Sequence, residues 1–314
     1  MIYTPVEQLL SDGEFHSGQA IADHLKISRV AVWKQIQRLK DWGLELESVR
    51  GKGYRIPDGL DLLCPEQITG DLRHDVQLVL ERSVGSTNDV VRKLQTDKPV
   101  YVIAEHQQNG RGRHMRPWYS PFASNIYLST KWRLDQGILQ AHGLSLVIGL
   151  AIARTMEREG LGGIQVKWPN DILVDGQKIA GVLIELEGDL MGSTEAIIGI
   201  GINFHLRDRS SISQPVADLK QLGYEAGRNR MIHRLIETLE ETKAQYVRYG
   251  FSRFRPLWQQ YDALWAKKVH TESGKIQLIG QAQGVDDRGG LRIMDEQGVM
   301  RVCYAGSIIS YSES

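Results

Sequence analysis

The sequence has few cysteines and no excess of charge of either sign. Two cysteines occur among 314 residues, Cys64 and Cys303, and neither belongs to a Cys-x-x-Cys pair or a Cys/His cluster. We therefore expect no disulfide framework and no protein metal site, and a reduced, cytoplasmic compartment. The 38 basic and 38 acidic side chains cancel, so any binding of nucleic acid must come from a local patch.

Long apolar runs are also lacking. The longest, Leu144 to Ala153, is interrupted by Ser145 and Gly149 and has about half the length needed to cross a bilayer. The N-terminus shows no basic segment followed by an apolar one, so neither a signal peptide nor membrane contact is expected. With 41% hydrophobic and 24% charged residues, the composition is that of a globular protein. Its length suits two domains, or three with small outer ones.

The first 56 or so residues have the pattern of a winged helix-turn-helix. Ser17 and Ser28 are suited to N-cap two successive helices, the second of which runs to about Trp42. Apolar residues recur every three to four positions along this second helix, at Val32, Ile36 and Leu39. The segment 49–56, which turns through glycines, then indicates a two-stranded ribbon.

Residues 26–55 carry a local excess of positive charge. They hold eight basic and three acidic side chains, a balance of plus five (8 − 3). The basic residues lie on the second helix and the ribbon, which are the elements that meet phosphates and a groove in such folds. We therefore predict DNA binding here; the alternative is a solvated face on a small interaction domain. The candidate DNA-binding residues are Ser28, Arg29, Val30, Lys34, Arg38, Arg50 and Lys52.

The rest of the chain predicts a mixed α/β domain followed by a small β-barrel. Strands are expected at 76–81, 100–107, 125–132, 165–167, 171–174, 178–186 and 196–203, with helices at 140–159 and 228–250. After Trp265 the sequence changes to short strands separated by Gly- and Asp-rich turns. The predicted domains are residues 1–63, 64–266 and 267–314.

A glycine- and arginine-rich segment follows one predicted strand. Glycines alternate with arginines from Gly110 to Arg113, which allows a tight turn that exposes N–H groups and brings guanidinium groups to an anion. The segment matches neither the P-loop nor the Rossmann glycine pattern. Such loops also bind RNA or are merely mobile, so the segment alone indicates anion binding without proving it.

A second segment, Lys167-Trp168-Pro169-Asn170-Asp171, lies between two predicted strands and is followed by Lys178. Its proline predicts an irregular turn with opposite charges gathered at strand ends. Alternatively, Lys167 and Asp171 form a surface pair and Asn170 caps the turn. A lone lysine such as Lys178 is more often solvated than catalytic.

Two further segments have simple structural explanations when each is taken alone. Ser86-Thr87-Asn88 stands between a strand and a helix, where helix capping is the usual role of small polar residues. The glycines in the segment 199–203 allow close packing within a strand.

In their order and spacing, however, these four segments resemble the biotin protein ligases. With Ser28 to Lys34 and Arg50 to Tyr54, the chain is similar to the bifunctional bacterial kind, which also represses the biotin operon. The resemblance covers essentially the whole chain. It implies an N-terminal winged helix-turn-helix, a central biotin- and ATP-binding catalytic domain of α/β (α+β) class related to class II synthetases, and a C-terminal SH3-like β-barrel.

The resemblance implies two chemical steps and a regulatory role. Biotin is first joined to ATP as biotinyl-5′-AMP, with release of pyrophosphate, and is then transferred to a lysine of the biotin carboxyl carrier protein. Mg²⁺ would accompany ATP and be held largely by phosphate oxygens. Biotinyl-AMP would promote a homodimer that binds operator DNA of biotin synthesis genes, while the carrier protein competes for the same surface.

The resemblance also assigns roles to residues of this chain. Arg113, Lys178 and Asp171 would be catalytic: the two cations would stabilise growing negative charge, and Asp171 is a candidate to orient the acceptor amine or accept its proton. Lys167, Asn170 and Asn203 would lie toward the adenylate. The residues expected around biotin are Ser86, Thr87, Asn88, Gln107, Arg111, Gly112, Arg113 and Lys178.

Two places depart from the family pattern. His114-Met115 follows Arg113 where the family often has another arginine or serine and a glycine, and Val302-Cys303-Tyr304 stands where an aromatic residue can lie beside the adenine. Two other functions remain open. A lipoate or octanoate ligase shares the fold but carries a triple-glycine motif that this chain lacks, and a non-catalytic sensor that represses transcription would equally explain the winged helix.

Overall fold

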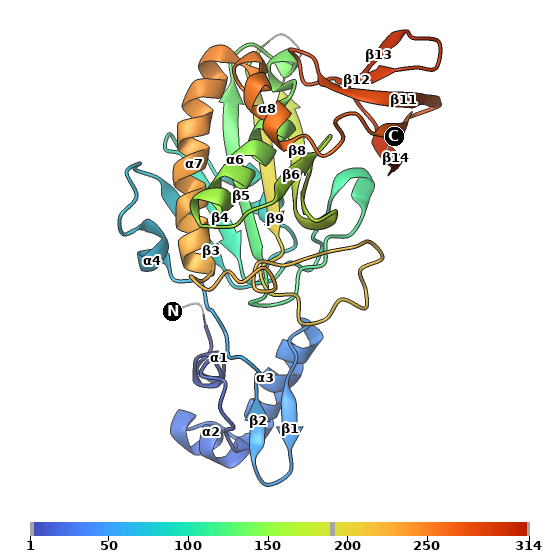
Figure 1. Ribbon diagram of the computed structural model, residues 1–314. Helices are drawn as coiled ribbons and strands as arrows, with labels where there is room; N and C mark the ends of the chain where they lie inside the picture. Colours follow the sequence, from blue (N-terminus) through green and yellow to red (C-terminus); the bar gives the residue numbers. More distant parts are fainter. Residues whose placement is uncertain (1–2, 189–191, 313–314) are drawn as a thin grey trace. The chain divides into compact units, whose positions relative to one another are not determined.

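The computed structural model describes residues 3–188 and 192–312 (Figure 1). The chain divides into two compact units, and each is described by itself. The first consists of residues 1–71, 75–130 and 200–232, and the second of residues 72–74, 131–199 and 233–314. The three domain boundaries expected from the sequence stay a prediction.

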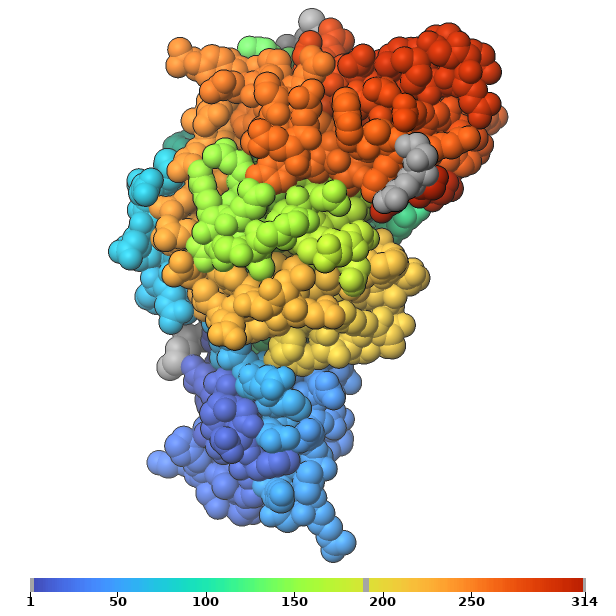
Figure 2. Space-filling model, viewed as in Figure 1, coloured from blue at the N-terminus to red at the C-terminus, as the bar shows by residue number. Residues whose placement is uncertain are grey.

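The first unit begins with the predicted winged helix, drawn in blue in Figures 1 and 2. The Ser17 and Ser28 hydroxyls accept the N–H groups of Ala20 and Ala31, which confirms both as N-caps. The predicted apolar stripe of the second helix is at most 1% exposed and forms the core of this body. Its elements are α1 (Pro5–Leu10), α2 (Gly18–Leu25), α3 (Arg29–Asp41) and the ribbon β1 (Glu47–Val49) and β2 (Gly53–Arg55).

Seven strands form one mixed sheet, in the order β3-β4-β5-β9-β8-β7-β6. β3 is parallel to β4, whereas the pairs β4–β5, β6–β7 and β7–β8 are antiparallel. The strands are β3 (Gln77–Glu81), β4 (Val100–Ala104), β5 (Ile126–Leu134), β6 (Ile164–Lys167), β7 (Asp171–Val174), β8 (Gln177–Gly188) and β9 (Thr194–Ile202). The first unit also contains α4 (Pro65–Thr69), α5 (Thr87–Lys93) and the short η1 (Arg113–Met115).

In the second unit, α6 (Leu144–Arg158) packs against β6, β7 and β8 (Figure 1). A Cβ at Gly149 would lie 2.9 Å from a methyl group of Val166, so glycine there lets the helix approach the sheet closely. The apolar stretch Ile138–Arg158 is long and apolar enough for a membrane span by length and composition alone, and 56% of its 18-residue apolar window is buried within the protein. The remaining helices are η2 (Ile138–Ala141), α7 (Arg228–Tyr249), η3 (Phe251–Arg253) and α8 (Arg255–Tyr261).

The C-terminal strands form a separate antiparallel sheet of five, in the order β13-β12-β11-β10-β14. The predicted fold class is therefore confirmed: a winged helix, a mixed α/β region and a small terminal β-structure. The strands are β10 (Lys268–Ser273), β11 (Ile276–Val285), β12 (Leu291–Met294), β13 (Met300–Cys303) and β14 (Ser307–Ser312).

One sequence expectation needs correction. The helix predicted to start at Gln140 starts at Leu144, because Gly143 adopts a left-handed conformation (φ 72°) and separates it from η2. Periodicity alone extends across such a break, because the residues on either side are also apolar.

Within the first unit, the end of α3 is bound to the end of β4. The indole of Trp42, the C-cap residue of α3, stacks on the His106 ring at a centroid distance of 4.9 Å and an interplanar angle of 15°. The Arg82 guanidinium covers the same indole at 4.8 Å and donates to the buried carboxylate of Glu7 in α1. The Trp42 carbonyl also accepts the N–H of Phe122 at 2.9 Å. The winged helix and the β4 end therefore share one packed junction.

Candidate functional site

A row of polar side chains lies where β4, β5 and α5 meet in the first unit; Thr87, Asn88 and Ser129 are buried and Gln107 is half-buried. The Oε1 of Gln107 accepts the backbone N–H of Thr87 at 3.0 Å and its hydroxyl at 3.1 Å. The Ser129 hydroxyl donates to Oδ1 of Asn88 at 2.6 Å and lies 2.7 Å from the Thr87 hydroxyl. Because such groups are costly to bury unless they are satisfied, their mutual bonds hold them in one orientation. We call Thr87, Asn88, Gln107 and Ser129 the polar row.

The structure does not support capping as the role of Ser86. Ser86 occupies the N-cap position of α5, but its side chain makes no capping hydrogen bond with the described backbone. It is nonetheless buried beside the polar row. Ser129 was missed from the sequence because a serine within an apolar strand resembles any other inward-facing small residue.

The segment Gly110–Trp118, which we call the Arg-Gly loop, folds back on itself. The Trp118 N–H donates to the Gly110 carbonyl at 2.8 Å, and the Gly112 N–H donates to the Arg116 carbonyl at 2.7 Å. The Trp118 ring lies close against Gly201 of β9, where an added Cβ would overlap it. This confirms that a glycine in the segment 199–203 permits close packing.

Arg111 anchors this loop to α5. Its guanidinium forms two bonds with the Asp89 carboxylate, at 2.6 and 3.1 Å, and Arg92 bonds the same carboxylate at 2.8 Å. The hydrogen bond from Arg111 is the main cause that lowers the pKa of Asp89. Arg113 begins η1 and is partly buried. After it, His114 and Met115 both adopt positive φ (54° and 57°), the conformation that a glycine would adopt without strain.

A cluster of charges lies at the turn between β6 and β7 in the second unit. The Lys178 ammonium forms an ion pair with Asp171 at 2.6 Å, and both side chains are mostly buried. Burial lowers the pKa of Lys167; the Asp171 charge opposes this and the Lys178 charge adds to it. Two cations thus act at one carboxylate, which leaves a local excess of positive charge. The structure pairs Asp171 with Lys178, and not with Lys167 as in the alternative interpretation of this segment.

The two asparagines expected near the adenylate bind main-chain carbonyls. Asn170 Nδ2 donates to Val182 at 2.8 Å and its N–H to Lys167 at 3.1 Å, so Asn170 shapes the turn. In the first unit, Asn203 Nδ2 donates to Ala217 at 3.2 Å.

Beside the charge cluster lies an aromatic residue that was not singled out from the sequence. The Lys167 ammonium stands 4.7 Å from the centroid of the Tyr311 ring in β14. Tyr304, by contrast, donates its hydroxyl to Asp286. Tyr311 was missed because cation–π contacts join residues far apart in the chain and leave no local pattern. Among residues 3–188 and 192–312, no group of three His, Cys, Asp or Glu side chains is placed to hold a metal ion.

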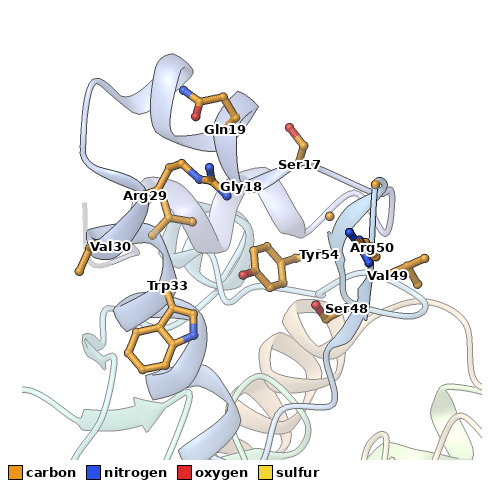
Figure 3. A pocket seen from close by; sticks show the side chains of 13 residues that line it. Ser17, Gly18, Gln19, Arg29, Val30, Trp33, Ser48, Val49, Arg50 and Tyr54 are labelled. Carbon is orange, nitrogen blue, oxygen red and sulfur yellow. The ribbon is translucent and has the colours of Figure 1, made fainter.

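The winged helix carries a groove of about 910 Å³ between α3 and the ribbon (Figure 3). We call it the helix–wing groove; among its lining residues are Arg29, Val30 and Trp33 of α3 and Ser48, Arg50 and Tyr54 of the ribbon.

The other DNA-binding candidates lie on the same two elements or at their ends, outside the lining of this groove. Ser28 caps α3, Lys34 and Arg38 are exposed on the same helix, and Lys52 lies over the Phe15 ring at 5.6 Å. The structure thus brings Arg29 and Arg50 to one groove from two elements. Trp33, which reasoning from charge alone passed over, also lines it.

Comparison with known proteins agrees with this architecture. Residues 80–203 match the Biotin/lipoate A/B protein ligase family, and residues 4–55 match an HTH domain. The biotin protein ligase from Aquifex aeolicus, solved in complex with biotin and ATP, is similar with a TM-score of 0.65 and 25% identity. The similarity covers 76% of this chain and 99% of that one. Fold and site together define a ligase of the biotin/lipoate class with an N-terminal helix-turn-helix domain.

Two curated relatives narrow the class. The Bifunctional ligase/repressor BirA of Escherichia coli strain K12 is 37% identical over 306 residues, which cover 96% of this chain and 94% of the relative. The protein of the same name from Bacillus subtilis strain 168 is 31% identical, with 92% of each chain covered. The chain belongs to the family of bifunctional ligase/repressor proteins.

Proposed function

We propose that this chain is an ATP-dependent biotin protein ligase that also represses biotin synthesis genes in response to biotin. One observation carries the proposal: 37% identity to a bifunctional ligase/repressor over 96% of the chain, a length that includes both the winged helix and the ligase-type sheet. The acceptor is a lysine of the biotin carboxyl carrier protein.

The polar row supports recognition of a small polar ring such as the ureido group of biotin. Its amide and hydroxyl groups are buried or half-buried and already oriented by one another, so binding orders little more of the protein. Ser86 directly precedes Thr87, and Gly112 lies in the Arg-Gly loop; both belong to the proposed biotin contacts. Arg111 contributes by anchoring the Arg-Gly loop through Asp89.

Lys178 and Arg113 supply the positive charge that the first step needs. A biotin carboxylate oxygen attacks the α-phosphorus of ATP, the bond to pyrophosphate breaks, and negative charge grows on the phosphoryl oxygens. Lys178 is held by Asp171 at 2.6 Å and is therefore positioned in advance. Lys167, Asn170, Asn203 and Tyr311 are proposed to bind the adenylate. Mg²⁺ would accompany ATP, be held largely by the phosphate oxygens rather than by this chain, and offset part of their charge.

In the second step the acceptor lysine amine attacks the acyl carbon of biotinyl-5′-AMP, AMP leaves, and the amine loses a proton. Asp171 is proposed to orient that amine or accept its proton, in addition to holding Lys178. Asp171→Ala in the transfer of preformed biotinyl-5′-AMP tests this, and an unchanged transfer rate would remove Asp171 from the step.

The ligase is tested by pyrophosphate release on mixing the full chain with biotin and ATP, followed by label transfer to a carrier domain. We expect Lys178→Met to lose at least 100-fold in adenylate formation, or about 2.7 kcal/mol of transition-state stabilisation. Release with lipoate or octanoate but not biotin would identify the other ligase type. Release with none of them would leave a non-catalytic sensor.

The repressor role is tested by a gel shift on a biotin-synthesis promoter. Binding is expected to require biotin plus ATP, to coincide with dimer formation in sedimentation, and to weaken when unbiotinylated carrier is added. A shift that is indifferent to biotin and ATP would refute ligand control. A cytoplasmic location stays part of the proposal.

A further inference from the structure

Two large apolar side chains of α3 remain exposed in the helix–wing groove. Val30 is 63% exposed and Trp33 is 52% exposed, whereas the apolar stripe Val32, Ile36 and Leu39 of the same helix is buried. Exposed apolar area in a concave, polar-rimmed surface marks a site of contact with another molecule.

Their positions place them at the end of α3 that reads base edges in helix-turn-helix proteins. Ser28 caps the helix, so Val30 is its second residue, and Trp33 follows three residues later on the same face. In Figure 3 both side chains stand with Arg29 on one helix, across from Ser48 and Arg50 of the ribbon.

The charge around this apolar pair identifies the occupant. Arg29 and Arg50 line the same groove, and Lys34 and Arg38 are exposed along α3. Residues 26–55 carry a net charge of plus five (8 − 3). A polyanion that carries an apolar group in its groove is complementary to these basic residues and to the apolar pair between them. In duplex DNA that feature is the thymine 5-methyl group, which projects into the major groove.

We infer that Val30 and Trp33 read thymine 5-methyl groups in the major groove. The operator half-site then carries thymine at the positions that face these two side chains. This deepens the proposed DNA-binding role and rests on it. Removal of one contacted methyl group is expected to weaken binding about fourfold, the ordinary contribution of one buried methyl group.

The test uses the full chain with biotin and ATP at one fixed salt concentration. Duplexes are first selected from a random library, and each thymine of the selected sequence is then replaced by uracil, which lacks only the methyl group. Wild-type protein is expected to lose about fourfold in affinity at one or two positions of each half-site and nothing elsewhere. This comparison needs no protein variant, so it does not depend on the folding of one.

Two variants then assign the contact. Val30→Ala is expected to bind thymine and uracil duplexes within twofold of each other at its own position. Lys34→Ala, the control, is expected to weaken both duplexes equally and to keep their ratio, since a phosphate contact carries no base information.

Equal affinities for thymine and uracil at every position would overturn the inference and leave DNA binding intact. If Val30→Ala instead changed the oligomeric state of the DNA-free chain and kept the thymine preference, the apolar pair would be a protein contact. Absence of any selected sequence would refute the proposed DNA-binding role itself.

Discussion

Gly110 allows the sharpest test of the Arg-Gly loop, because another glycine of the same loop is a matched control. A Cβ at Gly110 would overlap the Ser120 hydroxyl and lie 2.6 Å from the Trp118 carbonyl oxygen and 3.1 Å from Gln107 Nε2. A Cβ at Gly112 would meet only the Arg116 carbonyl oxygen, at 3.7 Å, which is an ordinary contact distance. Gly112 has a φ of −105°, which alanine adopts without strain.

The magnitude follows from which atoms must move. The Trp118 carbonyl belongs to the backbone. The Ser120 hydroxyl donates to that carbonyl and accepts from Gln107 Nε2, so none of these three groups can move without displacing the others. Overpacking of this kind costs about 1–3 kcal/mol, which corresponds to a Tm lowered by roughly 2–4 °C for each kcal/mol. Because Gln107 belongs to the polar row, the same displacement should weaken biotin binding by about 5- to 160-fold, if the whole 1–3 kcal/mol falls on the site.

Thermal unfolding and biotin titration calorimetry measure these effects on the full chain. Gly110→Ala should lower both Tm and affinity, whereas Gly112→Ala should keep the wild-type Tm. A lower biotin affinity in Gly112→Ala without a change in Tm would indicate that the ligand approaches that Cα. Wild-type Tm and affinity in Gly110→Ala would refute the reasoning.

Three other changes test separate parts of the fold. Burial lowers the pKa of His106 to about 4 from the ordinary 6.5, so the unfolded chain takes up the proton first and stability should fall as pH drops from 6.5 to 4. With solvent screening, we expect the free energy of unfolding from urea titrations to fall by about 1–2 kcal/mol over this pH range. This pH dependence should disappear in His106→Gln and remain in His24→Gln. The fully buried Arg228 donates to the fully buried Glu105 at 2.8 Å. Arg228→Met leaves the Glu105 charge unpaired, so it should lower the free energy of unfolding by about 3–5 kcal/mol, and adding Glu105→Gln should restore part of that loss. Equal stability of the single and double variants would contradict this. Gly201→Ala should displace Trp118 and speed tryptic cleavage of the Arg-Gly loop. Gly162→Ala is the control: a Cβ there meets nothing within 4 Å, so trypsin should cleave this variant at the wild-type rate.

Local patterns were sufficient for most of the fold. The caps at Ser17 and Ser28 and the buried stripe of α3 follow from spacing within one helix, because the groups that interact are a few residues apart. Most strands of the central sheet were likewise predicted to within a few residues at each end. The predicted start of α6 was wrong, because a left-handed glycine interrupts the apolar stretch there.

Pairing between distant side chains could not be predicted in the same way. Asp89 is 22 positions from Arg111, and in sequence it resembles any solvated helical acid. Tyr311 and Lys167 meet only because β14 returns to the end of β6. The family resemblance named the ligand-binding candidates, but the pairing of Lys178 with Asp171 required the folded chain.

The Trp42 junction limits how this protein can be engineered. The indole that ends α3 is also part of the packing around His106, one residue before Gln107 of the polar row. A chimaera that exchanges only the winged helix would leave His106 and Phe122 without the ring they stack against. The donor segment would therefore need a tryptophan at the position of Trp42. Without it, a graft designed to change only DNA binding would also disturb the packing next to the polar row.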